Sequence, residues 1–392
     1  MKNLSQTILV LLILTNLSCK TDKIENNMKT VDGLLNEQLS KNKTPGIQYY
    51  FFDTNSIIHS FNGGFADIKN QEKINDETTF NAWSVTKTFT ALAIVQLAEQ
   101  KLLKLDDPVI TYLPDFPYPK TITIKQLLSH SSGIPNPIPL KWVHTAEEHD
   151  SFDYKEYFIP VFEKNKKVKK RPNEKFAYSN LGYVFLGMII EEVSGESYTE
   201  YISKNIIQKI GIQPARLDFK VHNSKIHAKG YHKRIGFSNL ILGFLFDKSK
   251  FRIGTEGKWD AYKTIYVNGV SYGGLLGTGK SFVAYIQELL KSENQIISNK
   301  YKNLLFEENM LNNGKGSNMC LSWFKGELDG NTYYCHAGGG AGFYCEIRLY
   351  PELEKGSVIM FNRSGMSDAR FLDNIDKYFI QLITRKKRLY ET

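Results

Sequence analysis

Strand-like segments lie near both ends of this chain, whereas the long middle has mostly helical patterns. Alternating apolar runs near 47–52 and 56–63 predict a hairpin close to the N-terminus. The C-terminal strand candidates are Met319–Phe324, Asn331–His336, Gly342–Tyr350 and Gly356–Phe361. Because strands must bury a shared apolar face, we expect one antiparallel sheet assembled from the two ends, with the middle inserted as a helical lobe.

Other segments have apolar residues at helical spacing. Together with the strands they predict an α+β fold, in which an antiparallel sheet is flanked by helices and carries an inserted all-α lobe. The expected helices are 29–41, 84–101, 281–292 and 368–385. They define a single domain over 29–385, in which an α/β lobe (29–80 plus 264–385) holds an α lobe of about 81–263. A basic tail follows over 386–392.

The N-terminus resembles a secretory signal. Lys2 precedes the apolar run Ile8–Leu14, which is too short to span a bilayer, and Cys19 follows a small residue. We expect residues 1–18 to be removed, 19–28 to form a tether, and Cys19 to be lipidated, although ordinary cleavage beside an incidental cysteine stays open. The chain is then an exported bacterial protein on the periplasmic side, held at a membrane by its lipid anchor.

Charge and cysteine content limit the partners. The net charge is +9, concentrated in basic runs such as 165–171 and 385–388, which favour an anionic membrane or cell-wall surface. Aromatic residues are not interleaved with these runs, so nucleic acid is not expected as a partner. Cys320, Cys335 and Cys345 are expected to be free and buried, with a pairing of the last two left open.

Ser84 and Lys87 lie three residues apart and therefore share one face of a helix that begins near Ser84. A serine hydroxyl is a weak nucleophile at neutral pH, and a lysine whose pKa is lowered by its surroundings can accept its proton. Two later segments add polar groups to this pair. Phe176–Asn180 supplies a phenol and an amide before a helical run, and His336 precedes a run of glycines between strand candidates.

Taken in order, Ser-x-x-Lys, Tyr-x-Asn and a basic residue before glycines resemble the serine β-lactamase and penicillin-binding protein superfamily, in particular its branch related to class C β-lactamases and D-stereospecific esterases and peptidases. The connecting segments match too. They are Leu103–Val109, Ile122–Gly133, Gly182–Gly195 and Gly273–Leu275. The resemblance runs from about 30 to 385 and is weak near 135–170 and 230–262.

This resemblance implies a β-lactamase/transpeptidase-like fold with its site in the cleft between the lobes. Ser84 would attack a carbonyl, and Lys87 or Tyr178 would take its proton, an alternative that the sequence leaves open. Asn180 would orient Lys87 and bind a substrate amide. The backbone amides of Ser84 and Gly339 would hold the oxyanion, with Gly338 and Gly339 letting the acyl group approach the strand.

His336 departs from the family pattern, since β-lactamases and most penicillin-binding proteins carry a lysine there. A histidine is only partly charged near neutral pH, so it would hold a substrate carboxylate less firmly. Relatives with histidine include esterases and D-amino-peptide hydrolases, which lowers the expectation of strong β-lactamase activity. His130 lies where the family places a packing residue, and we interpret it as structural.

Three other features suggest different functions and are set aside. Gly274–Ser281 formally matches a phosphate-binding loop, but no buried strand precedes it and no strand ending in Asp supplies a magnesium ligand. His222, His227 and His232 recur every five residues, which does not place them on one helical face. No cofactor, metal or nucleotide is therefore expected. The apolar segment 235–246 is read as an insertion helix, with a lid or membrane-resting edge as the alternative.

The expected function is a serine hydrolase that forms an acyl-enzyme on Ser84 and cleaves an ester or amide, acting on a small molecule or a cell-wall-derived peptide. One alternative is a D,D-carboxypeptidase or β-lactamase. Another, from a different class, is a catalytically silent lipoprotein that binds cell-wall peptides. The complete set of Ser84, Lys87, Tyr178 and Asn180 argues against the silent scaffold.

Overall fold

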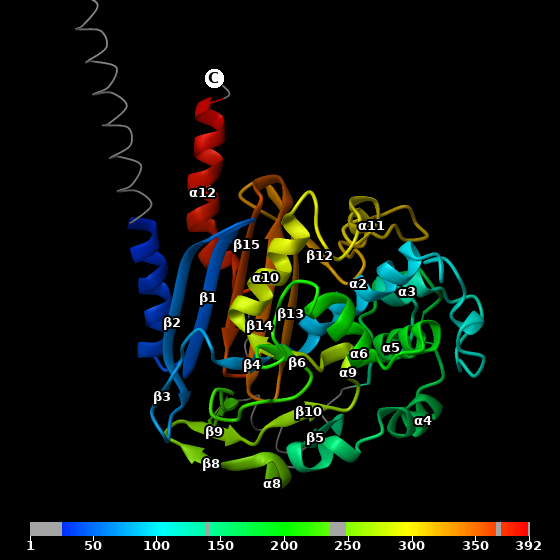
Figure 1. Ribbon diagram of the computed structural model, residues 1–392, viewed down its shortest axis with the longest axis horizontal. Coiled ribbons are helices and arrows are strands. Elements are labelled where there is room, and N and C mark those ends of the chain that lie inside the picture. Colours follow the sequence, from blue (N-terminus) through cyan, green and yellow to red (C-terminus); the bar gives the residue numbers. More distant parts are fainter. Residues whose placement is uncertain (1–25, 138–140, 169, 236–247, 366–369, 391–392) are drawn as a thin grey trace, which may run out of the picture.

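The computed structural model describes residues 26–137, 141–168, 170–235, 248–365 and 370–390. A seven-stranded antiparallel sheet in the order β12-β13-β14-β15-β1-β2-β3 forms its centre (Figure 1). These strands are β1 (Gly46–Asp53), β2 (Ile57–Asp67), β3 (Glu72–Lys73), β12 (Phe324–Leu328), β13 (Asn331–Gly340), β14 (Phe343–Tyr350) and β15 (Lys355–Phe361). The pairing of β1 with β15 joins the two ends of the chain, which confirms the sheet expected from the sequence.

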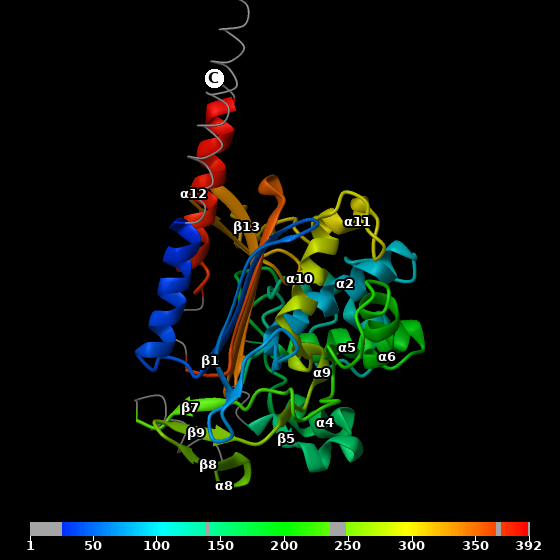
Figure 2. The same ribbon diagram turned by 60° about the vertical axis from the view of Figure 1, so that its left-hand side comes forward.

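Helices cover both faces of this sheet. A helix over residues 26–40 and the C-terminal α12 (Asp373–Tyr390) lie on one face, and α10 (Gly279–Leu290) and α2 (Thr86–Glu99) lie on the other, as the edge-on view shows (Figure 2). Alternation along β1 explains the two layers, because Tyr49 packs toward the first face and Tyr50 toward the second. We call these the terminal-helix face and the catalytic face.

The helix α2 occupies the centre of the molecule, between the sheet and the helices of the inserted region. Its residues from Thr86 to Ala98 are all buried, and its sequence is apolar on every side except for Lys87, three threonines and Gln96. A helix with this pattern is stable only when it is surrounded by other elements. The chain therefore carries the serine and lysine into the core of the fold.

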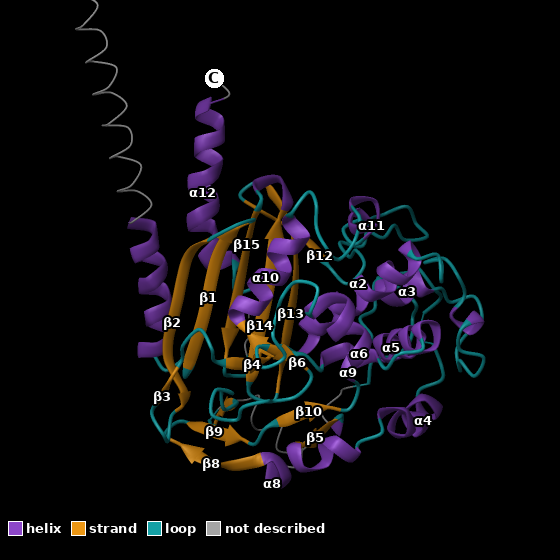
Figure 3. Ribbon diagram, viewed as in Figure 1, coloured by secondary structure: helices purple, strands orange, loops and turns teal. Residues whose placement is uncertain are grey.

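The remaining helices gather beside the sheet, largely between residues 120 and 305 (Figure 3). They are α3 (Ile124–Leu128), α4 (Tyr154–Lys164), α5 (Asn180–Ser194), α6 (Tyr198–Ile202), α8 (Lys248–Phe251), α9 (Val270–Gly273) and α11 (Asn299–Leu304). The inserted region is not wholly helical, in contrast to the all-α lobe expected from the sequence. It contributes strands to three small sheets, β4-β11-β6, β10-β5 and β7-β9-β8.

The strands of the small sheets are short. They are β4 (Thr79–Asn81), β5 (Val143–Thr145), β6 (Leu217–Asp218), β7 (Tyr231–Lys233), β8 (Arg252–Glu256), β9 (Trp259–Tyr262), β10 (Ile265–Val267) and β11 (Leu276–Thr278). Most have only two to four residues, which is too short for an alternating pattern to stand out in the sequence.

The strand expected at Met319–Phe324 is wrong in position, since β12 begins only at Phe324. Asn318 and Ser322 have positive φ angles of 54° and 72°, which interrupt an extended chain. Met319 instead forms an isolated bridge with Phe324. The apolar residues of this segment before Phe324 are buried in the core but do not belong to a strand.

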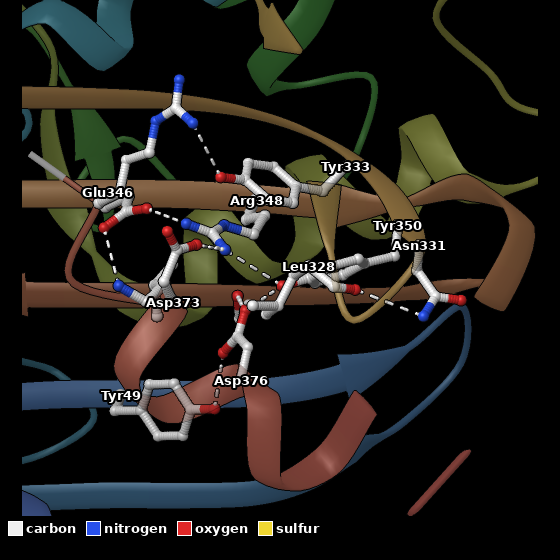
Figure 4. Close-up of polar contacts among 12 residues, drawn as sticks. Tyr49, Leu328, Asn331, Tyr333, Glu346, Arg348, Tyr350, Asp373 and Asp376 are labelled. Carbon is white, nitrogen blue, oxygen red and sulfur yellow. Dashed lines mark hydrogen bonds and ion pairs between the residues drawn. The ribbon is translucent and has the colours of Figure 1, made fainter. Parts of the chain in front are cut away.

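A buried ionic cluster fixes α12 to the terminal-helix face of the sheet (Figure 4). Arg348 of β14 lies 2.7 Å from Glu346 Oε1, forms a second ion pair with Asp373, and stacks 3.9 Å from the centre of the Tyr333 ring. Asp376 of α12 accepts hydrogen bonds from the hydroxyls of Tyr49 and Tyr350 at 3.1 and 2.9 Å. Both partners of the Glu346–Arg348 pair are fully buried, so this polar network is part of the core.

Several sequence interpretations lie outside the described residues. These include the signal sequence, Cys19, and all but the first residue of 235–246. Within the described ranges, no helix combines the length and the apolar character needed to cross a bilayer.

Candidate active site

Ser84 lies in the 3-10 turn η1 (Trp83–Val85), which leads directly into α2. It is the one partly exposed residue between Asn81 and Thr90, so its hydroxyl can be reached from the cleft. The turn is held by backbone hydrogen bonds from Ala82 N–H to Leu275 O and from Val85 N–H to Ala82 O. The nucleophile expected from the sequence therefore stands at the N-terminal end of a buried helix, where the helix dipole favours negative charge.

The backbone around Ser84 is strained and closely packed against β13. Trp83 has a φ angle of 49°, a left-handed conformation that is unfavourable for a bulky side chain. A Cβ atom on Gly338 would lie 2.1 Å from Ala82 O and 2.7 Å from Ser84 N, so only glycine permits this approach. A Cβ on Gly339 would meet nothing closer than 3.7 Å, which leaves the strand beside Ser84 accessible.

The edge of β13 next to Ser84 has no strand partner on that side among the residues that the structure describes. Pairing with β12 ends where Phe324 lies opposite Cys335, whereas β13 continues to Gly340. Residues 336–340 thus project beyond β12 toward η1. An unpaired strand edge offers backbone donors and acceptors to a bound substrate.

Lys87 points from the first turn of α2 toward Ser84. Its Nζ donates hydrogen bonds to Ser84 Oγ at 3.1 Å and to Tyr272 O at 2.7 Å. The rings of Tyr178, Tyr183 and Tyr272 surround the amine, with their centroids 5.0, 5.4 and 5.3 Å from Nζ. Burial lowers the pKa of Lys87 well below its ordinary value. The ion pairs among described residues include none with a carboxylate at Lys87, so nothing there offsets the desolvation.

Tyr178 approaches the same serine from the segment before α5. Burial raises the pKa of its phenol, and the nearby Ser84 hydroxyl partly offsets that rise. His130 lies behind the phenol with ring centroids 4.1 Å apart. The His130 ring accepts the N–H of Ser179 through Nδ1 at 3.1 Å, and its carbonyl accepts the N–H of Ala177 at 2.7 Å. His130 therefore holds both neighbours of Tyr178 and fixes the position of the phenol.

Asn180 is the first residue of α5 and is buried beside the cleft. Its backbone N–H donates to Asn136 Oδ1 at 3.0 Å, and its own Oδ1 has no partner among the described residues. It lines the same cavity as Ser84. The structure thus brings Ser84, Lys87, Tyr178 and Asn180 together, although Lys87 bonds to the Tyr272 carbonyl where the sequence suggested orientation by Asn180.

His336 is fully buried under the site and differs from the partly charged group suggested by its type. Burial and the nearby Lys87 lower its pKa to about 3, so the ring is neutral at physiological pH. Its Nδ1 donates to the carbonyl of Ser322, and its Nε2 has no partner among described residues. A neutral, buried imidazole cannot serve as a cationic clamp for a substrate carboxylate.

The structure also adds residues that the sequence reasoning missed. The carbonyl of Tyr272 holds Lys87, and the side chains of Trp83, Trp142 and Tyr272 line the cleft. Tyr272 directly precedes the recognised Gly273–Leu275 segment, but the residue types there do not indicate that a backbone carbonyl faces the lysine.

Other motifs do not join the site. Lys280 forms an ion pair with Asp76 at 2.6 Å, and Gly279 N–H donates to Gln48 Oε1 at 2.8 Å, so the phosphate-loop-like segment is packed against the sheet. Among the described residues, no group of three or more His, Cys, Asp or Glu side chains is arranged to hold a metal ion. Cys335 and Cys345 are free and pack in the clusters on opposite faces of the sheet, which rules out the disulfide left open above.

Comparisons with known proteins agree with this geometry. The sequence pattern of the family described as Beta-lactamase matches residues 28–378. Penicillin-binding protein 4* of Bacillus subtilis is 27% identical over 308 residues, covering 78% of this chain and 65% of that protein. Protein flp of Staphylococcus aureus is 29% identical over 211 residues, covering 53% of this chain and 41% of that protein. The chain therefore spans less than two thirds of the length of these curated relatives.

Solved structures share the fold. The octameric penicillin-binding protein homologue of Pyrococcus abyssi superimposes with a TM-score of 0.73 at 25% identity, covering 90% of this chain and 77% of that one. A D-amino acid amidase of Ochrobactrum anthropi gives a TM-score of 0.69 at 19% identity, covering 94% and 99% of the two chains. Because the family pattern spans nearly the whole described chain, this protein belongs to the β-lactamase family.

Proposed function

We propose that this protein is a serine hydrolase that cleaves an ester or amide through an acyl-enzyme on Ser84. The observation that supports it most directly is the position of the Ser84 hydroxyl beside a buried phenol and a buried lysine that has no carboxylate partner among the described residues. Such an arrangement removes the proton of a serine and returns it to a leaving group.

In the proposed acylation step, Lys87 Nζ takes the Ser84 proton while Oγ forms a bond to the substrate carbonyl carbon. The lowered pKa of Lys87 and the raised pKa of Tyr178 favour the neutral amine over a phenolate as the base. The neutral His336 also removes one of the two cations that could stabilise a phenolate. We therefore propose Lys87, and not Tyr178, as the general base.

The backbone amides of Ser84 and Gly339 would bind the negative oxygen that develops, and the open space at Gly339 leaves room for it. Collapse of the tetrahedral intermediate breaks the bond to the leaving group, which takes the proton back from Lys87 through the Tyr178 hydroxyl. Water then attacks the acyl-enzyme by the same route and releases the acid with a free Ser84.

Pre-steady-state release of p-nitrophenol from p-nitrophenyl acetate tests this proposal. We expect a burst close to one equivalent per active site, with a Ser84-linked acetyl group detectable by intact-protein mass spectrometry. Ser84→Ala should fold normally and show neither signal. A burst that survives in Ser84→Ala would place the nucleophile elsewhere.

A D,D-carboxypeptidase or β-lactamase is the second candidate, because the curated relative from Bacillus subtilis is named a penicillin-binding protein. The neutral His336 argues against it, since substrates of both activities carry a carboxylate beside the scissile amide. Stoichiometric labelling of Ser84 by a fluorescent penicillin would favour this candidate over an esterase.

We also propose that the protein is exported and held at the membrane through a lipid on Cys19. The apolar run before a cysteine supports this, together with the basic runs farther along the chain. In a bacterial host, incorporation of a labelled fatty acid should be lost in Cys19→Ser. Retention of the label in that variant would refute the anchor.

A further inference from the structure

A cavity of about 190 Å³ opens beside Ser84, on the side of Asn180 and Gly340. Its walls are mainly aromatic and aliphatic. The principal wall residues are Trp83, Trp142, Val143, Tyr262, Val267 and Tyr272. Four of these come from the small-sheet region, namely from β5, β9, β10 and the residue before β5. Most of the wall is thus supplied by the inserted region and by the adjoining strand β10.

The walls are held in place by ring contacts. Trp142 is nearly fully buried and meets Phe158 and Tyr272 edge-on, with ring centroids 5.1 and 6.0 Å apart. The Trp83 indole lies against Gly340, where an added Cβ would be 3.2 Å from the ring. These contacts indicate a preformed apolar pocket that does not depend on a bound group to order it.

No Asp, Glu, Lys, Arg or His occurs among the described residues that line this cavity. The polar groups there are the Ser84 hydroxyl, the Asn180 amide, Ser364, and tyrosine hydroxyls. An ammonium or carboxylate entering the cavity would lose its hydration without gaining an opposite charge, which is strongly unfavourable.

The position of Tyr178 identifies which part of a substrate enters the cavity. A leaving group needs a proton from the Lys87–Tyr178 pair, so it must lie near the Tyr178 hydroxyl. Tyr178 and His336 are not among the residues that line the cavity, whereas Ser84, Asn180 and Gly339 are. The acyl part of the substrate, on the other side of the scissile bond, therefore occupies the cavity.

We propose, on the basis of the hydrolase function above, that the natural substrate carries a compact, uncharged acyl group with an aromatic or branched apolar body. The volume is below the 300–1,000 Å³ typical of sites for larger ligands, which excludes a long acyl chain lying wholly inside. An acyl group with a free α-amine or a near carboxylate is rejected. The site thus selects acyl groups without a charge, including those of N-blocked amino acids, over amino acyl groups that carry a charge.

The test uses p-nitrophenyl esters that share one leaving group, so that differences report the acyl side alone. The series contains the phenylacetate, isobutyrate, dodecanoate, hemisuccinate and glycinate. We expect kcat/KM for the phenylacetate to exceed that of each charged ester and of the dodecanoate by about ten-fold or more. A hemisuccinate, glycinate or dodecanoate that reacts as fast as the phenylacetate would overturn the proposal.

A charge placed in the wall gives a sharper test. Val143→Lys should raise the ratio of hemisuccinate to phenylacetate kcat/KM by about ten-fold, because it supplies the missing counter-charge. The matched control is Ile253→Lys on β8, an exposed residue outside the cavity, which should leave the ratio unchanged. An unaltered ratio in a folded Val143→Lys protein would assign the cavity to something other than the acyl group.

The two proposals fail in different ways. If none of the esters gives a Ser84-dependent burst, the hydrolase function is wrong and the cavity has no acyl group to select. If all give the burst at similar rates, the hydrolase stands and the acyl selectivity is wrong. Where Val143→Lys does not fold, the ester series on the unaltered protein still decides the question.

Discussion

Lys87 and Arg348 are both buried basic side chains, and they lie on opposite faces of the same sheet. Arg348 on the terminal-helix face has two carboxylate partners and the Tyr333 ring. Lys87 on the catalytic face has only a hydroxyl, a carbonyl and aromatic rings around it. The two carboxylates keep Arg348 charged. Lys87 has no carboxylate partner among the described residues, so its amine loses a proton more easily. The fold thus separates a structural cation from a buried amine that acts as the base in the proposed mechanism.

Removal of the Lys87 amine should have the largest effect on the proposed catalysis. We expect Lys87→Met to reduce kcat for p-nitrophenyl acetate on the order of 10³-fold, because Ser84 loses its base. Its free energy of unfolding in urea should stay the same or rise, since an uncompensated buried amine is replaced by an apolar chain. A variant that keeps more than a tenth of the activity would shift the role of base to Tyr178, which Tyr178→Phe would then examine.

Removal of the structural cation should have the opposite profile. Arg348→Met leaves Glu346 without its partner in the core, so we expect it to lower the free energy of unfolding by about 3–5 kcal/mol. The kcat of the folded protein should change less than two-fold, because the cluster lies across the sheet from Ser84. The double variant Glu346→Gln/Arg348→Met should recover part of the stability. A large fall in kcat for Arg348→Met at full folding would show that the faces are coupled.

Acidification should change the stability contributions of the two faces in opposite directions. We expect this change to be the smallest of the predicted effects. Burial lowers the pKa of His336 to about 3 and that of His227 to about 4. Below about pH 6.5 the unfolded chain therefore binds more protons than the folded state does. The free energy of unfolding consequently decreases as the pH is lowered through this range. Burial raises the pKa of Asp376 to about 6, so its protonation partly opposes this loss. Each such histidine costs about 1 kcal/mol at pH 5.5.

Urea unfolding at pH 7 and pH 5.5 measures this balance. His227→Asn should lose less stability between the two pH values than the unaltered protein, and Asp376→Asn should lose more. Equal pH slopes in all three proteins would contradict the assignment of opposite signs to the two faces.

Sequence reasoning worked best where the chemistry is local in the chain. Ser84 and Lys87 are only three residues apart, so the turn that leads into α2 brings them into contact without help from the rest of the fold. The meeting of Tyr178 with Ser84 needs the whole fold, and the resemblance to a known family supplied it. The shared sheet followed from strand patterns at both ends, because alternation over many residues is a strong signal.

The features that could not be predicted from the sequence depend on packing between residues far apart in the chain. Glu346 and Arg348 alternate with apolar residues on β14, a pattern typical of a strand with one exposed face, yet both are fully buried under α12. The Tyr272 carbonyl and the strained backbone of Trp83 leave no mark in residue type. Strands of two to four residues in the inserted region are likewise too short to be recognised from alternation.

The unpaired end of β13 has a consequence for how this enzyme fold can diversify. In the proposed reaction, a substrate that lies along residues 336–340 is bound by main-chain atoms, which are the same whatever the side chains are. Substitution of side chains therefore has little effect on this main-chain binding, except where a larger residue replaces Gly338. New substrate preferences can therefore arise by altering the walls contributed by β5, β9 and β10, while the machinery that activates the carbonyl is left untouched.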